Sequence, residues 1–460
     1  MKISPNHIAI SSAVGAVLLI VGLVIGAGAG YVYSSSTVKG GATATSTSTT
    51  TVTTTGGATT VTTGGSTVTT TVTSTAGGAG PVTYTIGTVL PTTGNYASYG
   101  VSFQNSVNLA VKQMNANLTA AGSNIQFAVV SADDAGTASG ALSALQSEFQ
   151  AKGIQAEIGP LTSGEVQGVV QFATQNHIVI LPGAATATSL VGISPYVFRP
   201  GQPGDQLEGT SIAKSIIQTG GKNVVFLYRD DTSESGTFNI AKGILTAAGL
   251  QVQGIALPAN QPDYSAQVQT AGTDVSAYLS GGGTTSNTVV ALLDGGTEAQ
   301  NVFQHAATDP NLGKVRWYGI ESLADPTLLK SSVGGFMSQV SLTISAPSTL
   351  NSPQFAYFNS TYTKAYGTSP LPYSNYFYDN TWIAMLSVLA AGSYDGSKII
   401  QVLPTVVDHF FGSSSTGIWL VNHDQSIGFY DILKCTSVSG ANTYVKIGSY
   451  NGQTNILTLS

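Results

Sequence analysis

Charged side chains are scarce in this sequence of 460 residues, since only 8% are Asp, Glu, Lys or Arg, against about 25% in ordinary soluble domains. With so few charges, networks of salt bridges cannot be the main source of stability. The net charge of −6 and the lack of a basic run argue against binding to nucleic acid. We hypothesise that the protein works in an acidic exterior, where carboxylates would be titrated in any case.

Cysteine and histidine are also rare. The single cysteine, Cys435, excludes an intramolecular disulfide and a cysteine-based zinc site. The five histidines are scattered without metal-ligand spacing, so we expect no metal and no cofactor. The sequence has no G-x-S-x-G motif and no glycine-rich phosphate loop after a strand, which argues against an enzyme. A hydrolase with an irregular site stays open on these residues alone.

The first 33 residues carry a long uncharged run. Residues 8–33 contain no charged side chain, and the run exceeds the roughly 20 residues that cross a bilayer. We therefore expect a membrane anchor at 1–33, with the N-terminus inside because Lys2 precedes the run. A cleaved secretory signal is the rival interpretation, and a pilin-like signal processed near its start is a variant of it. No cysteine follows the run, which excludes a lipid-anchored lipoprotein.

Residues 34–81 form a low-complexity segment of Thr, Ser, Gly, Ala and Val with one charge, Lys39. Such a composition cannot bury a core, so we expect a disordered linker whose hydroxyls can carry O-linked sugar. The anchor and the linker would hold a globular domain in the extracellular space. Two N-glycosylation sequons, at Asn117 and Asn359, fit an exterior domain.

The rest of the chain alternates short apolar runs with amphipathic helical runs. Strands are expected at 85–90, 125–130, 156–158 and 178–181, and a second series at 223–228, 251–256, 288–293 and 315–318. Helices are expected between them, including 205–218, 236–248 and 298–307, and later at 353–366 and 376–391, before a β-rich end from residue 418. This repeat predicts two α/β lobes with doubly wound parallel sheets.

The segment 155–165 reads as a buried strand that enters a turn and opens a helix. Gly159 and Pro160 break the strand, and Thr162 or Ser163 can cap the helix. Such a turn directs backbone N–H groups and a hydroxyl at one point, where a small anion such as a carboxylate can bind. The alternative is an ordinary strand-to-helix connection.

Polar residues follow the predicted strands. Ligands in open α/β sheets lie beyond the carboxyl ends of strands, so these residues are candidates for a site. The first lobe offers mainly hydroxyls and backbone N–H groups and the second more carboxylates, which suits a zwitterion held between them. Asp133 and Asp134 are instead expected to cap the following helix. The other candidates are Thr92, Thr93, Asn95, Tyr96, Leu161, Thr162, Ser163, Ala184, Thr186, Arg229, Asp230, Asp294 and Glu321.

Several short motifs together resemble one family. They are Ile86-Gly87-Thr88-Val89-Leu90-Pro91, Ile158-Gly159-Pro160-Leu161-Thr162-Ser163-Gly164, Leu181-Pro182-Gly183-Ala184-Ala185-Thr186, Tyr196-Val197-Phe198-Arg199 and Tyr318-Gly319-Ile320-Glu321. In order and spacing, residues 82–460 resemble the type I substrate-binding proteins of ABC importers, specifically the leucine/isoleucine/valine-binding branch in an archaeal membrane-anchored form.

The resemblance implies a two-lobed periplasmic-binding-protein-like fold with three crossovers, in which 82–200 and 347–431 form lobe 1 and 201–346 and 432–460 form lobe 2. It implies no chemistry and no cofactor. The ligand would be a small amino acid, of the branched-chain class, which the protein delivers to a membrane permease. The alternative is a cell-surface sensory or structural protein of the same fold that recognises an amide, urea or another small solute.

The resemblance also assigns roles to residues. The ligand carboxylate would meet the hydroxyl of Ser163, with Thr162 beside it, and groups of Ala184 and Thr186, while the ammonium would meet Glu321. Asp294, at the end of a strand in the second lobe, is a further candidate. The family places aromatic residues where this chain has Ser233 and Gly295. Tyr96 or Tyr99 would then supply a wall of the pocket.

Overall fold

The computed structural model describes residues 51–55, 58–63, 66–70, 81–348, 352–414, 420–421, 423–425 and 428–460. The expected membrane anchor at 1–33 lies outside the described residues. Among the helices that are described, none combines the length and the apolar character needed to cross a membrane.

The Thr-rich segment contains three short strands, β1 (Thr51–Thr55), β2 (Ala58–Thr63) and β3 (Ser66–Thr70). They pair antiparallel in sequence order, and the register places Val61 of β2 opposite Val52 and Val68. These strands lie within residues 34–81, the segment that we expected to be a disordered linker. Threonine and valine are β-branched, and their stiff side chains favour the extended backbone of a strand.

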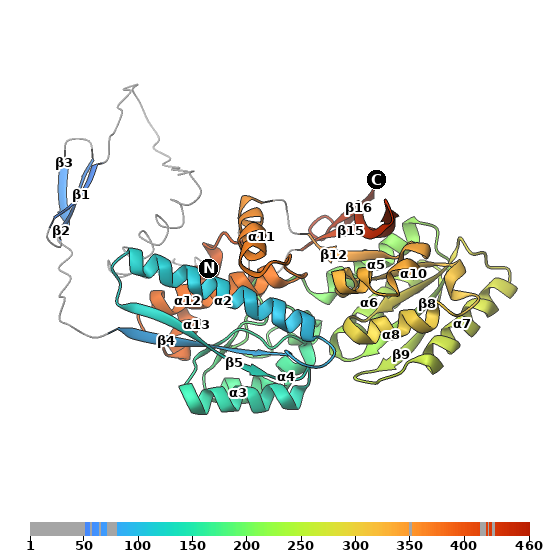
Figure 1. Ribbon diagram of the computed structural model, residues 1–460, viewed down its shortest axis with the longest axis horizontal. Coiled ribbons are helices and arrows are strands. Elements are labelled where there is room, and N and C mark those ends of the chain that lie inside the picture. The colour runs from blue at the N-terminus through green and yellow to red at the C-terminus, as the bar shows by residue number, and fades with distance from the viewer. Residues whose placement is uncertain are drawn as a thin grey trace, which may run out of the picture. The chain divides into compact units, whose positions relative to one another are not determined.

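The first lobe is built on a four-stranded sheet of order β5-β4-β6-β7. Its strands are β4 (Val82–Leu90), β5 (Ile125–Asp133), β6 (Ala156–Glu157) and β7 (Val179–Ile180). The pairs β4–β6 and β6–β7 are parallel, as the βα repeat predicts. The connecting helices are α2 (Ala97–Ala120), α3 (Ala138–Lys152) and α4 (Ser163–Gln175), and α3 and α4 pack on the same face (Figure 1).

Three later helices complete the first lobe. They are α11 (Pro353–Tyr366), α12 (Ser374–Ala391) and α13 (Gly396–Asp408), and α12 and α13 lie on the face of the sheet opposite α3 (Figure 1). Phe103 of α2 stacks on Phe377 of α12 with ring centroids 4.1 Å apart. The sequence did not predict α13, because Pro404 lies inside it and proline normally ends a helix.

The second lobe is built on an eight-stranded sheet of order β17-β16-β15-β12-β11-β10-β8-β9. Five strands are parallel: β8 (Asn223–Asp230), β9 (Gln251–Pro258), β10 (Thr288–Leu293), β11 (Arg316–Ile320) and β12 (Thr343–Pro347). The other three are antiparallel: β15 (Phe429–Val438), β16 (Ala441–Asn451) and β17 (Ile456–Leu459).

The second sheet is therefore mixed, and our prediction of a wholly parallel sheet is wrong there. Ser439 and Gly440, with φ of 52° and 83°, form a two-residue turn between β15 and β16. Such a short turn joins only antiparallel strands. The expected lobe boundary at residue 431 falls inside β15. The remaining strands, β13 (Leu420–Val421) and β14 (Asp424–Gln425), form a separate antiparallel pair.

Helices cover both faces of the parallel part of this sheet (Figure 1). Successive residues of β8 and β10 enter different cores: Val225, Leu227, Val290 and Leu292 pack with Trp317, whereas Val224, Phe226 and Val289 pack with Phe238. The helices of this lobe are α5 (Asp205–Gln218), α6 (Thr232–Ala247), α7 (Ser265–Ser280), α8 (Gly296–Ala306), α9 (Pro326–Lys330) and α10 (Gly334–Gln339). Among the described residues, the 3-10 turns are η1 (Thr188–Leu190), η2 (Leu312–Lys314) and η3 (Glu321–Ala324).

Candidate functional site

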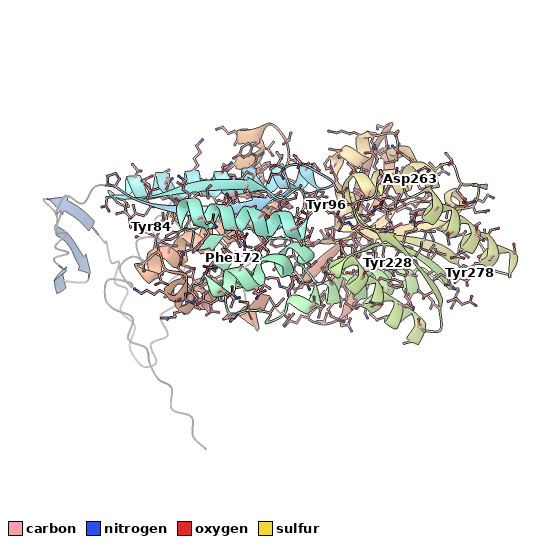
Figure 2. All side chains as sticks on the ribbon, turned by 90° about the horizontal axis from the view of Figure 1, so that it is seen from below. Tyr84, Tyr96, Phe172, Tyr228, Asp263 and Tyr278 are labelled. Carbon is pink, nitrogen blue, oxygen red and sulfur yellow. The ribbon has the colours of Figure 1, made fainter. Side chains whose placement is uncertain are left out.

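A cavity of about 60 Å³, counted as the space open to the centre of a water-sized sphere, is lined by residues of both lobes. Tyr96, which lies at the junction of the two lobes in Figure 2, is one of them. A single water occupies roughly 10–15 Å³ on this measure, so the cavity has room for a small solute. Six of the seven predicted ligand-binding residues line it: Tyr96, Thr162, Ser163, Ala184, Thr186 and Glu321.

The start of α4 forms one wall of the cavity. Thr162 is the N-cap, as predicted: its hydroxyl accepts from the Glu165 N–H at 3.3 Å, and the Glu165 carboxylate accepts from the Thr162 N–H at 2.6 Å. Ser163 is 2% exposed, and its hydroxyl oxygen accepts from the Ala187 N–H at 3.0 Å. The hydroxyl hydrogen of Ser163 can still be donated to an anionic group of a solute.

The neighbouring segment of Ala184 and Thr186 is fixed by buried side chains. One guanidinium nitrogen of Arg199 donates to the carbonyl oxygens of Ala185 and Ala187, at 3.0 and 2.9 Å. Gln202 donates to the carbonyl oxygen of Pro182 at 2.7 Å. These bonds hold an irregular loop in one conformation, so that Thr186 presents its hydroxyl to the cavity.

The Thr186 hydroxyl starts a hydrogen-bonded chain that reaches the second lobe. It lies 3.0 Å from the Ser233 hydroxyl, which donates to a carboxyl oxygen of Asp205 at 3.0 Å. Burial raises the pKa of Asp205 to about 7. Ser233 occupies the position where the family resemblance led us to expect an aromatic residue. A hydroxyl at that position makes this wall polar.

Two carboxyl groups of the second lobe line the cavity together. Glu321, which follows β11, is 8% exposed, and Glu208, in the first turn of α5, is 5% exposed. Burial raises the pKa of both groups, and the charge of Glu321 raises that of Glu208 further. Tyr373, a third lining residue, has φ of 68° and hydrogen-bonds to Glu321. A bulky residue in this left-handed region is rare, and such residues cluster at binding sites.

Arg229, a cation that lies over the ring of the lining residue Tyr96, is already paired. It donates to Glu298 at 2.7 Å and to Asn260 at 3.2 Å, and it forms an ion pair with Asp231. Burial acts to raise the pKa of Asp231, but the hydrogen bond from Glu234 and the charge of Arg229 bring it below its usual value. Burial and the nearby Asp231 charge raise the pKa of Glu234. The second-lobe wall is therefore acidic.

Tyr96 supplies the aromatic wall that the chain lacks at Gly295. A Cβ atom on Gly295 would lie 2.7 Å from the Ser322 side chain and 3.3 Å from the Tyr96 ring, so the glycine leaves space for both side chains. Tyr99 packs edge-on against Tyr96 and donates to the Ser322 carbonyl oxygen at 2.8 Å. The aromatic surface that the second lobe lacks at this position therefore comes from the first lobe.

Asp294 is not brought into the cavity. Its side chain is fully buried behind the wall, and one carboxyl oxygen accepts from the Gly295 N–H at 2.7 Å. A strand end places a residue near the site, but the side-chain direction at that end depends on the local turn. Asp294 therefore acts on the site indirectly, through the position of Gly295 and through its carbonyl oxygen, which accepts from the Ser322 hydroxyl at 3.2 Å.

Asp133 and Asp134 do not cap a helix, so that prediction is wrong. The N-cap of α3 is Thr137, whereas Asp133 accepts from the Thr92 and Thr93 N–H groups at 2.8 and 3.2 Å. Two extra residues before the helix, Ala135 and Gly136, have positive φ and turn the chain.

The candidate glycosylation residues Asn117 and Asn359 are half-buried and lie in α2 and α11.

The sequence did not single out Glu208, Glu234 or Tyr373. Glu208 lies in the first turn of an amphipathic helix, where an acidic residue is expected for the helix dipole alone. In the sequence, this position was marked only by the periodic apolar residues that follow it and that predict a helix. Among the residues that the structure describes, no group of three or more His, Cys, Asp and Glu side chains is arranged to hold a metal ion.

Comparison with known families identifies the class of protein. The family model for "Periplasmic binding protein" matches residues 83–416, which is more than half of the chain. This chain therefore belongs to that family. Its members bind small solutes for transport and catalyse no reaction.

Two curated relatives match about half of their own length. An uncharacterized protein of Methanocaldococcus jannaschii is 28% identical over 205 residues, which is 43% of this chain and 49% of the relative. A Leu/Ile/Val-binding protein of Rhizobium johnstonii is 28% identical over 186 residues, or 40% of this chain and 49% of the relative.

Solved structures share the fold over most of the chain. The leucine-binding protein LivK of Thermotoga maritima has a TM-score of 0.67 at 18% identity, covering 81% of this chain and 99% of that one. A solute-binding protein of Rhodopseudomonas palustris in complex with 3,4-dihydroxybenzoic acid has a TM-score of 0.67 at 19% identity, covering 80% and 98%. The likeness establishes the two-lobed α/β fold that we predicted.

Proposed function

We propose that this protein binds a small α-amino acid between its two lobes and delivers it to an ABC-type permease. The observation that carries the proposal is the opposition of hydroxyl groups and carboxyl groups in one cavity. Ser163 and Thr186 lie on the first-lobe side, and Glu208 and Glu321 lie on the second-lobe side. A zwitterion matches this arrangement, with its carboxylate toward the hydroxyls and its ammonium toward Glu321.

The charge of the cavity favours an amino acid over an aromatic acid. Among the described residues, no lysine lines the cavity, and Arg229, which lies behind Tyr96, is paired with Asp231 and Glu298. A solute such as a dihydroxybenzoate would bring a negative charge toward buried carboxyl groups without a free cation to meet it. The relative that binds such an acid therefore shares the fold but is a poor guide to this ligand.

A branched-chain side chain fits the apolar part of the wall. Phe103, Leu161 and Ile320 line the cavity beside Tyr96. Burial of a leucine-sized side chain against such a surface contributes about 1.5–3 kcal/mol. The names of the leucine-binding protein and the Leu/Ile/Val-binding protein among its relatives support the same class.

A second candidate function follows from the state of the carboxyl groups. With their pKa values raised by burial, Glu208 and Glu321 can hold a proton and offer a hydrogen-bond donor as well as acceptors. A neutral amide or urea could satisfy such a pair. This supports the alternative of a surface protein that recognises an amide, urea or a similar solute.

The N-terminal sequence supports a proposal for the location of the protein. We propose a single-pass anchor within residues 1–33 that leaves the binding domain outside the cell membrane. A tether keeps the solute-binding domain near its permease at high effective concentration. The half-buried Asn117 and Asn359 stay candidates for glycosylation.

The test is a binding screen of the full-length protein. Leucine, isoleucine and valine should raise its melting temperature, because a ligand that binds only the native state stabilises it. The panel includes acetamide, urea and 3,4-dihydroxybenzoate. A response to acetamide or urea alone would favour the second candidate, and a response to dihydroxybenzoate alone would contradict the charge argument.

A further inference from the structure

We propose that Glu208 and Glu321 share one proton in the absence of solute, and that the positively charged group of the solute displaces this proton when it binds. The inference rests on the proposed function and adds a proton to its binding reaction. One carboxylic acid, one carboxylate and one ammonium ion give two carboxylates around the ammonium ion and one proton released to solvent. No bond other than the O–H bond is broken.

The geometry provides the first argument. Both side chains line the same cavity, and both are more than nine-tenths buried. Oε1 of Glu208 and Oε2 of Glu321 are buried and have no hydrogen-bond partner in the described part of the chain. A buried carboxylate oxygen without a donor is costly, so these two oxygens mark the place where a cation or a proton must bind.

The part of the chain that the structure describes provides no ion-pair partner for the two carboxyl groups. Among the described residues, no lysine or arginine forms an ion pair with Glu208 or Glu321. Arg229 is held by Asp231 and Glu298, and Arg199 donates to two carbonyl oxygens of the first lobe. Two like charges in one buried site cannot both be stable, so one of the two carboxyl groups keeps its proton.

The other titratable groups around the pair act in two directions: Asp205 and Glu234 raise the pKa of Glu208 further, whereas Tyr373 lowers that of Glu321. Asp205 lies on the same helix as Glu208, Glu234 and Asp231 lie on α6, and Tyr99 lies on α2. Asp231 is paired with Arg229, which leaves the carboxyl groups of Asp205 and Glu234 as the acidic neighbours of Glu208. The remaining neighbours are Tyr373 before α12, Tyr376 on α12 and Tyr430 on β15.

An ammonium group changes this balance. It donates up to three hydrogen bonds and brings a positive charge, so both carboxyl groups can be ionised around it. The proton they shared then leaves for solvent. A neutral amide brings no charge, and the pair would keep its proton. Proton release therefore distinguishes a cationic ligand from a neutral one.

The first experiment is titration calorimetry of the full-length protein with L-leucine at about pH 6.5, in two buffers of very different protonation enthalpy. The expected result is a buffer-dependent heat equivalent to about one proton released per leucine. The Glu208→Gln variant should bind leucine without this dependence. The exposed Asp230, outside the cavity, gives the matched control Asp230→Asn, which should behave as wild type.

The outcomes separate this inference from the proposed function. Leucine binding with equal heats in both buffers would overturn the shared proton and leave amino-acid binding intact. Binding of acetamide or urea alone, without proton exchange, would overturn both. If no compound binds, infrared difference spectra decide: a protonated-carboxyl band lost in Glu208→Gln supports the shared proton, and its absence in the wild type refutes it.

Discussion

The hydroxyl groups of Thr186 and Ser233 lie 3.0 Å apart, although 47 residues separate them in the sequence. Thr186 belongs to the loop after β7 in the first lobe, and Ser233 belongs to the first turn of α6 in the second. Ser233 also donates to Asp205 at 3.0 Å. The hydrogen bond therefore joins the two lobes at the wall of the cavity, so the proposed solute binding would be coupled there to closure of the lobes.

Replacement of Thr186 by valine should weaken solute binding. The Thr186→Val change keeps the shape of the side chain but removes the hydroxyl, so one hydrogen bond between the lobes is lost. We expect about fivefold weaker binding of leucine, equivalent to roughly 1 kcal/mol. Calorimetry measures the change. The exposed Thr188 provides the control Thr188→Val, and equal affinities of the two variants would show that the Thr186 hydroxyl does not contribute.

Replacement of Glu321 by glutamine should affect charged ligands selectively. Glu321→Gln removes the carboxylate that would meet the ammonium group and keeps the volume of the side chain. We expect leucine to bind about thirtyfold more weakly, a loss of about 2 kcal/mol, because a charge-assisted hydrogen bond is replaced by a neutral one. Binding of acetamide or urea, where detectable, should change little. An unchanged affinity for leucine would refute the assignment of Glu321 to the ammonium group.

The stability of the protein should fall as pH rises from acidic to neutral. Burial raises the pKa of Glu148 and of Asp134 to about 8 in the folded protein, from ordinary values of 4.5 and 3.8. Between those values the folded state binds protons that the unfolded state has lost, so the free energy of unfolding decreases with pH until about pH 8. The decrease should amount to roughly 5 kcal/mol for one such group between its two pKa values, because one pKa unit corresponds to about 1.4 kcal/mol.

The variant Glu148→Gln should flatten this dependence. Its amide cannot ionise, so it removes the contribution of one buried carboxyl group beside Glu157, whose own pKa is raised by burial and by the Glu148 charge. Urea unfolding between about pH 4 and pH 8 measures the effect. Asp408, exposed at the end of α13, gives the control Asp408→Asn. Stability that rises from pH 5 to 8 would contradict the burial argument.

A side chain at Gly296 should separate the two lobes. Gly296 has φ of 62°, and a Cβ atom there would lie 2.5 Å from the carbonyl oxygen of Asn95 in the first lobe. Asn95 also accepts from the Glu298 N–H at 3.0 Å and from the Thr297 hydroxyl at 2.8 Å. These contacts are incompatible with the added methyl group.

Gly296→Ala should therefore weaken leucine binding by tenfold or more and lower stability by about 1 kcal/mol. Thermal unfolding and calorimetry measure the two effects. In the helix α6, Gly243 has open space around its Cβ position, so Gly243→Ala should bind leucine normally and be slightly more stable. Normal binding by both variants would show that closure does not need the contact between Gly296 and Asn95.

Much of the secondary structure could be predicted because its signals are local. The helices Asp205–Gln218 and Pro353–Tyr366 and the strand Thr288–Leu293 have the predicted bounds. Their ends carry a proline, a glycine or a capping residue beside a periodic apolar run. The antiparallel strands β15 to β17 join the second sheet through contacts with β12 that no local pattern contains.

The candidate site shows the same division between residues that a local pattern predicts and residues that only folding brings together. Thr162, Ser163, Thr186 and Glu321 follow predicted strands, so the βα pattern placed them near the edge where ligands bind. Asp294 satisfies the same pattern, yet its side chain turns into the core. Glu208 follows no strand and reaches the cavity from α5, where only the packing of that helix brings it beside Glu321.

The sequence by itself determined the alternation of strands and helices, the cap at Thr162 and the shortage of cations. These features depend on neighbouring residues, whose distances are set by the covalent chain. Only the tertiary structure decided that Glu208 and Glu321 share a cavity, and that Tyr96 fills the space left by Gly295. Electrostatic repulsion and steric fit depend on distance and burial in space, and residues from different segments acquire both only when the chain folds.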